Sequence, residues 1–252
     1  MPTTELIAIA ALGGISGLMI GCIGIGGVIL VPSLVFLAGI PIRIGIPAAM
    51  MAYILSGLVA TAVFARNKSI RWGMATWLCA GATPTAFAGA WAVSVVNPRL
   101  LEVCLGLLTL LSGANSLWTQ NVPDRPEAAL SNKGLLLVGA VTGFLSSISG
   151  TGGPLVMVPI VISLSVPVLV AVGLSQVIQL PVAIAATVGN VIYGELDLIL
   201  AGILAASLTI GSWYGARLAH VVPRATLRGI VSIVLVVVGT FILGSVIWRL
   251  IR

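Results

Sequence analysis

The sequence predicts an all-α polytopic membrane protein that is built from two inverted repeats. Three observations carry this prediction: an almost uncharged apolar composition, a glycine-rich signature that occurs twice about half a chain apart, and loops of opposite charge at equivalent places in the two halves. Each repeat is expected to hold about five hydrophobic segments, of which the first two are short, broken or re-entrant.

Composition places the chain in a bilayer. Charged residues make up 7% of the sequence, hydrophobic residues make up 59%, and the mean hydropathy is +1.22, whereas a soluble domain carries roughly 25% charged residues. A spanning helix needs about 20 uncharged, largely apolar residues. Stretches without Asp, Glu, Lys or Arg cover 6–42, 44–65, 72–98, 103–123, 134–194, 198–216 and 229–248.

Charge and cysteine usage exclude several other classes of protein. The net charge of +6 fits the basic cytoplasmic loops of a membrane protein, because the chain has no arginine-rich run that would favour nucleic acid. The three cysteines lie in apolar segments without CxxC spacing, so we expect neither a disulfide nor a zinc site. Residues 1–7 lack a basic region, and we expect the first apolar segment to be a retained helix rather than a cleaved signal.

The glycine signature defines the repeat. Its first copy, GLMIGCIGIGGVILVP, covers 17–32, and its second, GFLSSISGTGGPLVMVP, covers 143–159. An offset of 126 residues joins Gly26 to Gly152. The same offset, within one residue, joins Pro41 to Pro167, Gly89 to Gly215, Pro98-Arg99 to Pro223-Arg224, and Gly113 to Gly239.

Proline, glycine and charge divide each half into five segments. We expect repeat one over 1–118, a polar cytoplasmic linker over 119–133 and repeat two over 134–252. The second segment of each half is too short to cross about 30 Å of hydrocarbon comfortably, so the first two segments form either short tilted helices or a re-entrant hairpin. The segments are expected at roughly 5–22, 27–40, 45–65, 73–96 and 101–118, and at roughly 134–149, 153–166, 168–193, 198–220 and 226–248.

Loop charges predict that the repeats are inverted. The loop at 66–71 holds three positive charges, whereas its counterpart at 194–197 holds two negative ones. The loop at 97–102 is neutral, whereas 217–228 contains three arginines. Because cytoplasmic loops carry the excess of Lys and Arg, equivalent loops are expected on opposite faces of the membrane.

The glycine clusters predict a helix break inside each repeat. Three glycines in four residues weaken a helix and leave backbone N–H groups in need of partners. A helix that restarts after such a break presents its positively polarised N-terminus and backbone N–H groups without partners, and these favour an anionic ligand. We favour this site over close helix packing alone because the break is duplicated. The residues concerned are Gly24, Gly26, Gly27, Gly150, Gly152 and Gly153.

Polar side chains in apolar segments add candidate contacts. Amides and hydroxyls are costly in an apolar span without partners. For any one of them, hydrogen bonding between helices is as good an explanation as contact with a substrate. The candidate substrate-binding side chains are Ser56, Ser149, Thr151, Gln176, Gln179 and Asn190.

The middle of each segment lacks chemistry-bearing residues. No Asp, Glu, Lys or Arg lies there, which argues against a carboxylate proton relay. The only histidine, His220, lies near a segment end without a partner at ligand spacing. We therefore expect no catalytic residue, metal or cofactor. The rivals are a membrane-embedded enzyme, which would need a nucleophile and base or a metal, and an assembly factor without transport.

The duplicated signature, Gly-Ile-Gly-Gly…Val-Pro followed by Ser-Gly-Thr-Gly-Gly…Val-Pro, resembles the TauE/SafE family of sulfite exporters. The resemblance covers about residues 6–243. It implies transport of small sulfur-containing anions, such as sulfite or organosulfonates, across a bacterial or archaeal inner membrane. By motif position it points to the signature glycines and to Pro32 and Pro159.

These observations together predict a permease that carries a small oxyanion by alternating access at a site between the two helix breaks. The family resemblance makes sulfite or a sulfonate the expected substrate and export the expected direction. The expected partners are the lipid bilayer and the small anion, and no nucleic acid. The sequence leaves a homo-oligomer open.

Overall fold

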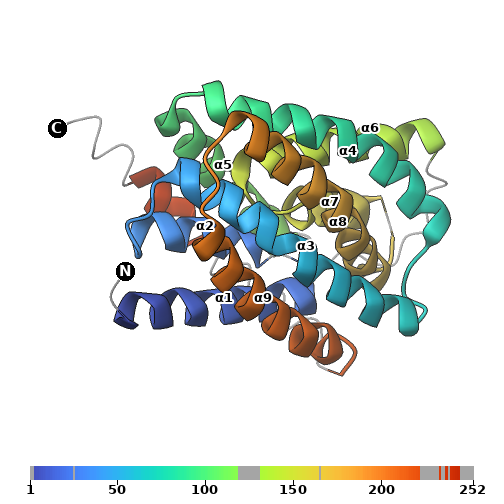
Figure 1. Ribbon diagram of the computed structural model, residues 1–252. Helices are drawn as coiled ribbons and strands as arrows, with labels where there is room; N and C mark the ends of the chain where they lie inside the picture. Colours follow the sequence, from blue (N-terminus) through green and yellow to red (C-terminus); the bar gives the residue numbers. More distant parts are fainter. Residues whose placement is uncertain are drawn as a thin grey trace.

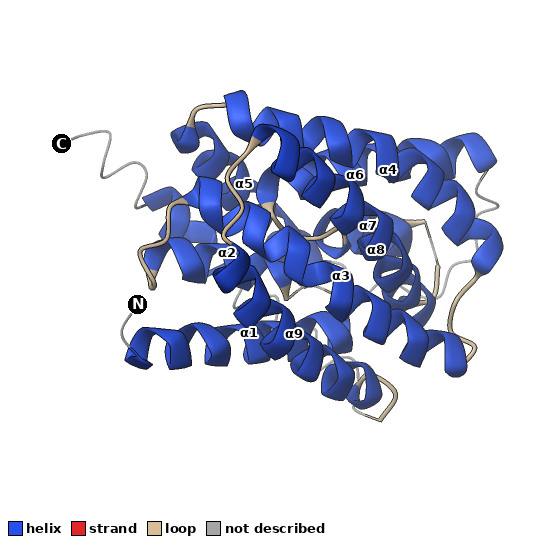
Figure 2. Cartoon of the chain, viewed as in Figure 1, coloured by secondary structure: helices blue, strands red, loops and turns tan. Residues whose placement is uncertain are grey.

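The computed structural model describes residues 3–24, 26–118, 131–164 and 166–221, together with 233, 236–237 and 239–244. No strand occurs among these residues, which form helices joined by short turns (Figures 1 and 2). This confirms the all-α prediction for the part of the chain described. The helices are α1 Thr3–Ile23, α2 Gly27–Phe36, α3 Ile42–Arg66, α4 Trp72–Val95, α5 Pro98–Trp118, α6 Asn132–Ser149, α7 Pro154–Ser163, α8 Val168–Tyr193 and α9 Leu198–Leu218.

Helix boundaries lie close to the expected segments. The largest differences at a helix start are three residues, in α3, which begins at Ile42 rather than at residue 45, and in α5, which begins at Pro98 rather than at residue 101. In α3 the earlier start arises because Pro41 is its N-cap and Pro47 is accommodated inside the helix. The linker 119–133 and the last expected segment, 226–248, lie largely outside the described residues. The division into two repeats stays a prediction.

Helix lengths fit a multi-pass membrane protein. Five helices of the described chain are long and apolar enough to cross a membrane. The shorter helices α2 and α7 have ten residues each, which is about 15 Å at 1.5 Å per residue. Each of these two therefore reaches through only half of a hydrocarbon core of about 30 Å.

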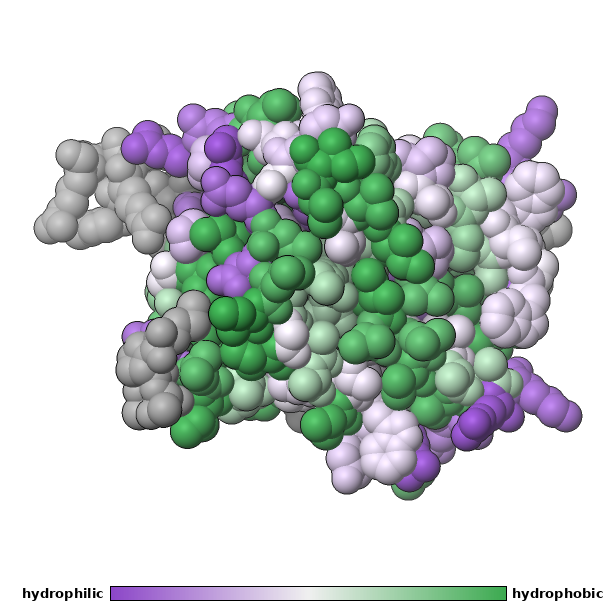
Figure 3. Space-filling model, in the orientation of Figure 1, coloured by the Kyte–Doolittle hydropathy of each residue, from purple (hydrophilic) through white to green (hydrophobic). Residues whose placement is uncertain are grey.

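The surface is apolar where a bilayer would meet it. Hydrophobic side chains cover the middle of the face seen in Figure 3, and hydrophilic ones gather towards its left and right edges. Large exposed hydrophobic residues include Leu55 and Leu58 of α3, Trp91 of α4, Leu137 of α6 and Ile210 of α9. Lipid, rather than water, is the solvent that such a surface requires.

Helix α1 packs against α9, and α6 packs against α4. In terms of the predicted repeats, the first helix of each packs against the fourth helix of the other. Glycine makes both contacts possible. A Cβ atom on Gly17 would overlap the backbone of Leu208, and one on Gly143 would overlap the backbone of Ala82. Both members of the second pair lie 126 positions before or after their counterparts in the first. The two interfaces therefore use equivalent positions, with backbones in close approach as is typical of membrane helices.

The equivalent helices α3 and α8 lie at the centre and run antiparallel. Gly173, near the start of α8, packs against the backbone of Ser69, which follows the end of α3. Further along α8, Gln179 packs against Gly57 in the middle of α3. The two helices also begin alike, since Pro41 and Pro167 cap them with φ/ψ of −55°/136° and −54°/136°. Elements that are equivalent in sequence thus point in opposite directions.

We predict opposite effects of alanine at two glycines of α1. Gly17→Ala should destabilise the protein by about 1–3 kcal/mol, the usual cost of overpacking, because its methyl group meets the backbone of α9. The methyl group of Gly14→Ala would meet no atom within 4 Å. This substitution should leave the stability unchanged or raise it, because alanine is the better helix former. Thermal unfolding in detergent measures both, and equal midpoints for the two variants would contradict the packing described.

Candidate functional site

Both glycine signatures form helix breaks. In the first, α1 ends at Ile23, Gly24 adopts φ 81°, and α2 restarts at Gly27. In the second, Gly150 ends α6 with φ 70°, Gly152 and Gly153 have φ 77° and 113°, and α7 restarts at Pro154. These positive φ values are ones that side-chain-bearing residues rarely adopt, which explains the need for glycine.

The two breaks pack against each other. A Cβ atom on Gly27, the first residue of α2, would overlap the carbonyl oxygen of Thr151 in the second break. A Cβ atom on Gly150 would lie 2.8 Å from Cγ2 of Val31 in α2. The sequence prediction that the signatures lie together agrees with these contacts, of which the one between Gly27 and Thr151 joins backbone to backbone.

Tyr53 of α3 lies between the breaks and was not among the predicted site residues. It is fully buried, and its hydroxyl donates a 3.4 Å hydrogen bond to the carbonyl oxygen of Gly27. Its ring packs on Gly152, whose Cβ atom would lie 2.9 Å from the ring. One signal in the sequence could have found it, because Tyr53 is 126 residues before Gln179, its counterpart in repeat two.

The two predicted glutamines of α8 both reach repeat one. The Nε2 group of Gln179 lies 3.2 Å from the Ser56 hydroxyl and 3.4 Å from the Tyr53 carbonyl oxygen. The Nε2 group of Gln176 donates to the carbonyl oxygen of Ile20, in the last turn of α1, at 2.8 Å. Interhelical hydrogen bonding, one of the two explanations left open by the sequence, is therefore part of what these amides do.

The predicted hydroxyls of the second break bond to one another. The Ser149 hydroxyl donates to the Leu145 carbonyl oxygen at 2.7 Å. The Thr151 hydroxyl lies 2.9 Å from the Ser149 hydroxyl. Ser56, Ser149, Thr151, Gln176 and Gln179 are each at most 2% exposed. The structure therefore shows this cluster closed on all sides.

Two other polar residues lie away from this cluster. Asn190 is buried, but it lies 11 residues beyond Gln179, about 16 Å along α8. The structure thus does not bring Asn190 to the breaks. His220 follows α9 and contacts Ser69 at 3.5 Å across the end of α3. Neither residue can contact a small ligand held between the breaks.

The electrostatics of the site come from helix ends. The N-terminus of α2 carries no side-chain cap, since Gly26 is its N-cap residue, whereas Ser131 and Asp197 cap α6 and α9 with their side chains. The first backbone N–H groups of a helix have no acceptor within it. The start of α2 therefore offers positive partial charge, which suits an anion.

We predict that Gly152→Ala destabilises the protein more than Gly39→Ala. Both glycines have positive φ, 77° and 66°, so alanine at either costs on the order of 1 kcal/mol of backbone strain. Only at Gly152 does the methyl group also meet the Tyr53 ring, whereas Gly39 has open space around it. The extra cost should be about 1–3 kcal/mol, measured as the difference between their thermal midpoints. Equal midpoints would contradict the contact between Gly152 and Tyr53.

Comparison with known proteins identifies the family. The model of the sulfite exporter TauE/SafE family matches residues 9–242. Three relatives carry the name probable membrane transporter protein. YunE of Bacillus subtilis is 24% identical, covering 93% of this chain and 96% of its own. A protein of Methanocaldococcus jannaschii is 26% identical over 94% of each chain, and YdhB of Bacillus subtilis is 22% identical over 90% of this chain and 96% of its own.

No solved structure matches the chain. The family is one of exporters, which agrees with the prediction that the chain is not an enzyme. Spanning helices and transporter relatives together make it a multi-pass membrane transporter, in agreement with an inner-membrane location in a prokaryote. Since the family model extends over nearly the whole sequence, this chain belongs to the sulfite exporter TauE/SafE family.

Proposed function

We propose that the protein exports a small sulfur-containing oxyanion, such as sulfite or an organosulfonate, and that the anion binds between the two helix breaks. The contact of Gly27 with the Thr151 carbonyl carries this proposal, because it brings both breaks to one place. The description of the family as sulfite exporters supports the class of substrate. Prokaryotic relatives named as transporters support the activity in general.

Recognition of the anion rests on the backbone. The start of α2 presents N–H donors without a side-chain cap, and the glycines allow a ligand to approach these donors closely. Such donors are fixed in place by the helix and keep their partial charge at every pH. They also suit a transported anion, because no permanent positive charge holds the substrate too tightly to leave.

Transport requires the closed cluster to open alternately to each side. Because Tyr53, Gln176 and Gln179 are buried, substrate can reach them only when α3 and α8 move relative to their neighbours. Inverted repeats supply two such openings, since exchanging the conformations of the two halves exchanges the sides from which the site is reached. We include this inverted arrangement in the proposal.

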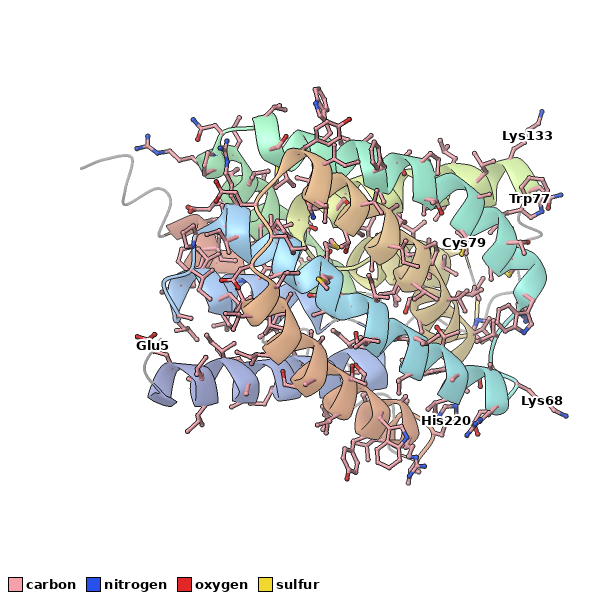
Figure 4. All side chains as sticks on the ribbon, viewed as in Figure 1. Glu5, Lys68, Trp77, Cys79, Lys133 and His220 are labelled. Carbon is pink, nitrogen blue, oxygen red and sulfur yellow. The ribbon has the colours of Figure 1, made fainter. Side chains whose placement is uncertain are left out.

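Two observations support inverted topology. Equivalent helices α3 and α8 pack antiparallel, through Ser69 with Gly173 and Gly57 with Gln179. In Figure 4, Glu5 lies at the left end of the molecule, whereas Lys68, Lys133 and His220 lie towards the right end. The positive-inside rule then assigns the Lys68 end to the cytoplasm and the loop 194–197 to the opposite face.

We predict that proteoliposomes containing the protein conduct sulfite or a sulfonate, within a panel that also includes sulfate, thiosulfate, taurine, sulfoacetate and carboxylates. Gly27→Ala should lower this flux about tenfold or more, because its methyl group overlaps the Thr151 carbonyl and narrows the junction of the breaks. A tenfold loss corresponds to roughly 1.4 kcal/mol. Gly14→Ala, which meets open space, is the matched control and should retain the parental flux.

Flux at the parental rate in Gly27→Ala would place the anion site elsewhere. Absence of flux for every anion in the panel, from folded parental protein, would overturn the proposed substrate class. Equal amounts of reconstituted protein and the thermal midpoint of each variant in detergent separate a blocked site from an unfolded one.

We predict that cysteines at positions 67 and 195 are labelled from opposite sides of the membrane. Asn67 and Glu195 are exposed in equivalent loops, after α3 and α8. Asn67→Cys and Glu195→Cys are made in a background without Cys22, Cys79 and Cys104, and intact cells are treated with an impermeant maleimide. Only Glu195→Cys should react before the cells are permeabilised. Reaction of both in intact cells would contradict the inverted arrangement.

A further inference from the structure

The amide groups of Gln176 and Gln179 are each only half satisfied. Their Nε2 donors bond to protein oxygens, but each Oε1 atom is buried and accepts no hydrogen bond from any residue that the structure describes. A buried acceptor without a partner is costly, and in a native protein it calls for an explanation such as a bound ion.

Exchanging the oxygen and nitrogen of these amides does not remove the difficulty. The partner of Gln176 is the carbonyl oxygen of Ile20. Gln179 faces the carbonyl oxygen of Tyr53 at 3.4 Å and the Ser56 hydroxyl at 3.2 Å. A carbonyl oxygen only accepts hydrogen bonds, so an exchanged Gln176 would set two acceptors against each other. An exchanged Gln179 could accept from Ser56 but would turn its oxygen towards the Tyr53 carbonyl. The two Oε1 atoms are therefore left facing away from these partners.

A fully deprotonated oxyanion cannot satisfy these oxygens. Both Oε1 atoms carry negative partial charge and would repel the oxygens of sulfite or a sulfonate. The groups that suit them are a cation or a hydrogen-bond donor. This requirement separates the glutamines from the N–H groups at the start of α2, which suit the opposite charge.

The position of Gln176 favours a cation. Its amide lies at the C-terminal end of α1, because Ile20 is in the last turn of that helix. The Ile20 carbonyl itself accepts from the Gly24 N–H at 2.8 Å as well as from Gln176. The end of a helix carries negative partial charge, and the carbonyl groups that follow Ile20 are the ones without N–H partners within the helix. Gln179 follows one turn later on the same face of α8. In membrane transporters, broken-helix carbonyls of this kind are typical ligands of coupling ions.

We propose that the Oε1 atoms of Gln176 and Gln179, with backbone carbonyl oxygens at the end of α1, bind a monovalent cation. Its role as a coupling ion rests on the proposed anion transport, although its binding does not. Neutral oxygens suit sodium or a similar ion, and the described residues contain no group of three or more His, Cys, Asp or Glu that would favour a more highly charged metal. A cation here would also lie near an anion at the start of α2 and lower the cost of burying that charge.

Thermal unfolding of the full-length protein in detergent, without any sulfur oxyanion, tests the binding. Sodium chloride is titrated against choline chloride at constant ionic strength, with lithium and potassium chloride as further arms. A bound cation should raise the midpoint saturably, by about 2–4 °C or more. Identical midpoints in all four salts would overturn the proposal.

Variants locate the cation. Gln176→Leu and Gln179→Leu should abolish or strongly reduce the rise in midpoint. The matched control is Ser175→Ala, because Ser175 is fully buried beside Gln176 but its hydroxyl is satisfied by the Val172 carbonyl of its own helix at 2.7 Å. Its response to the cation should equal the parental one. A full response in Gln176→Leu, or a lost response in Ser175→Ala, would contradict the assigned ligands.

A second variant covers the case in which Gln176→Leu does not fold. Gln176→Glu keeps an oxygen at the site and adds negative charge when it ionises, so its response to the cation should exceed the parental one and grow as the pH rises. An unchanged response would overturn the proposal.

Flux separates this inference from the proposed function. If anion flux is equal in sodium and choline and the thermal midpoint does not depend on the cation, the cation site is contradicted and the proposed transport function stands. If the thermal midpoint depends on the cation but the protein transports none of the anions, the proposed substrate is contradicted and the cation site stands.

Discussion

The contact between the two helix breaks is the constraint on which the rest of the structure depends. A break at membrane depth leaves backbone N–H and C=O groups that lipid cannot satisfy, so it must be buried against protein. Here the first residue of α2, Gly27, lies directly on the carbonyl of Thr151 in the other break. Neither break can be buried in this way without the other, which ties the two halves of the chain into one unit.

The helices around this centre also pack with their backbones in close contact. For the two breaks to meet, α1 and α6 must reach the middle of the molecule, each held by a helix of the other half. Gly17 and Gly143 permit this at equivalent positions, against Leu208 and Ala82. Lipid supplies no hydrophobic drive between helices, so van der Waals contact between closely packed backbones stabilises the assembly. This demand explains many of the 30 glycines of the chain, although not Gly14 or Gly39, which have open space around them.

Sequence was sufficient for the helices and for the place of the breaks, because charge, proline and clustered glycine act locally. Pro167 fixes the start of α8 at the predicted residue 168, whereas α3 begins directly after Pro41, three residues before the predicted start. The partners of buried polar groups are a different matter, because hydropathy does not say which way a side chain points. Tyr53 was missed since an aromatic residue in an apolar helix is ordinarily core, and Asn190 was included although it lies about 16 Å along α8 from Gln179.

The two halves share a backbone plan but not a chemistry. At positions 126 residues apart, Gln176 corresponds to Met50, and Ser146 corresponds to Ile20. At these two positions repeat two holds a polar side chain where repeat one holds an apolar one, whereas Ser56 of repeat one corresponds to Val182, and all six residues are buried. In the proposed mechanism, the equivalent helices of the two halves would serve alternate opening, since exchanging their conformations exchanges the side from which the site is reached. The proposed binding site has no such need for symmetry, because a single anion would bind between the halves. Polar groups from either half would then set its selectivity, while their apolar counterparts keep the packing that closes the site.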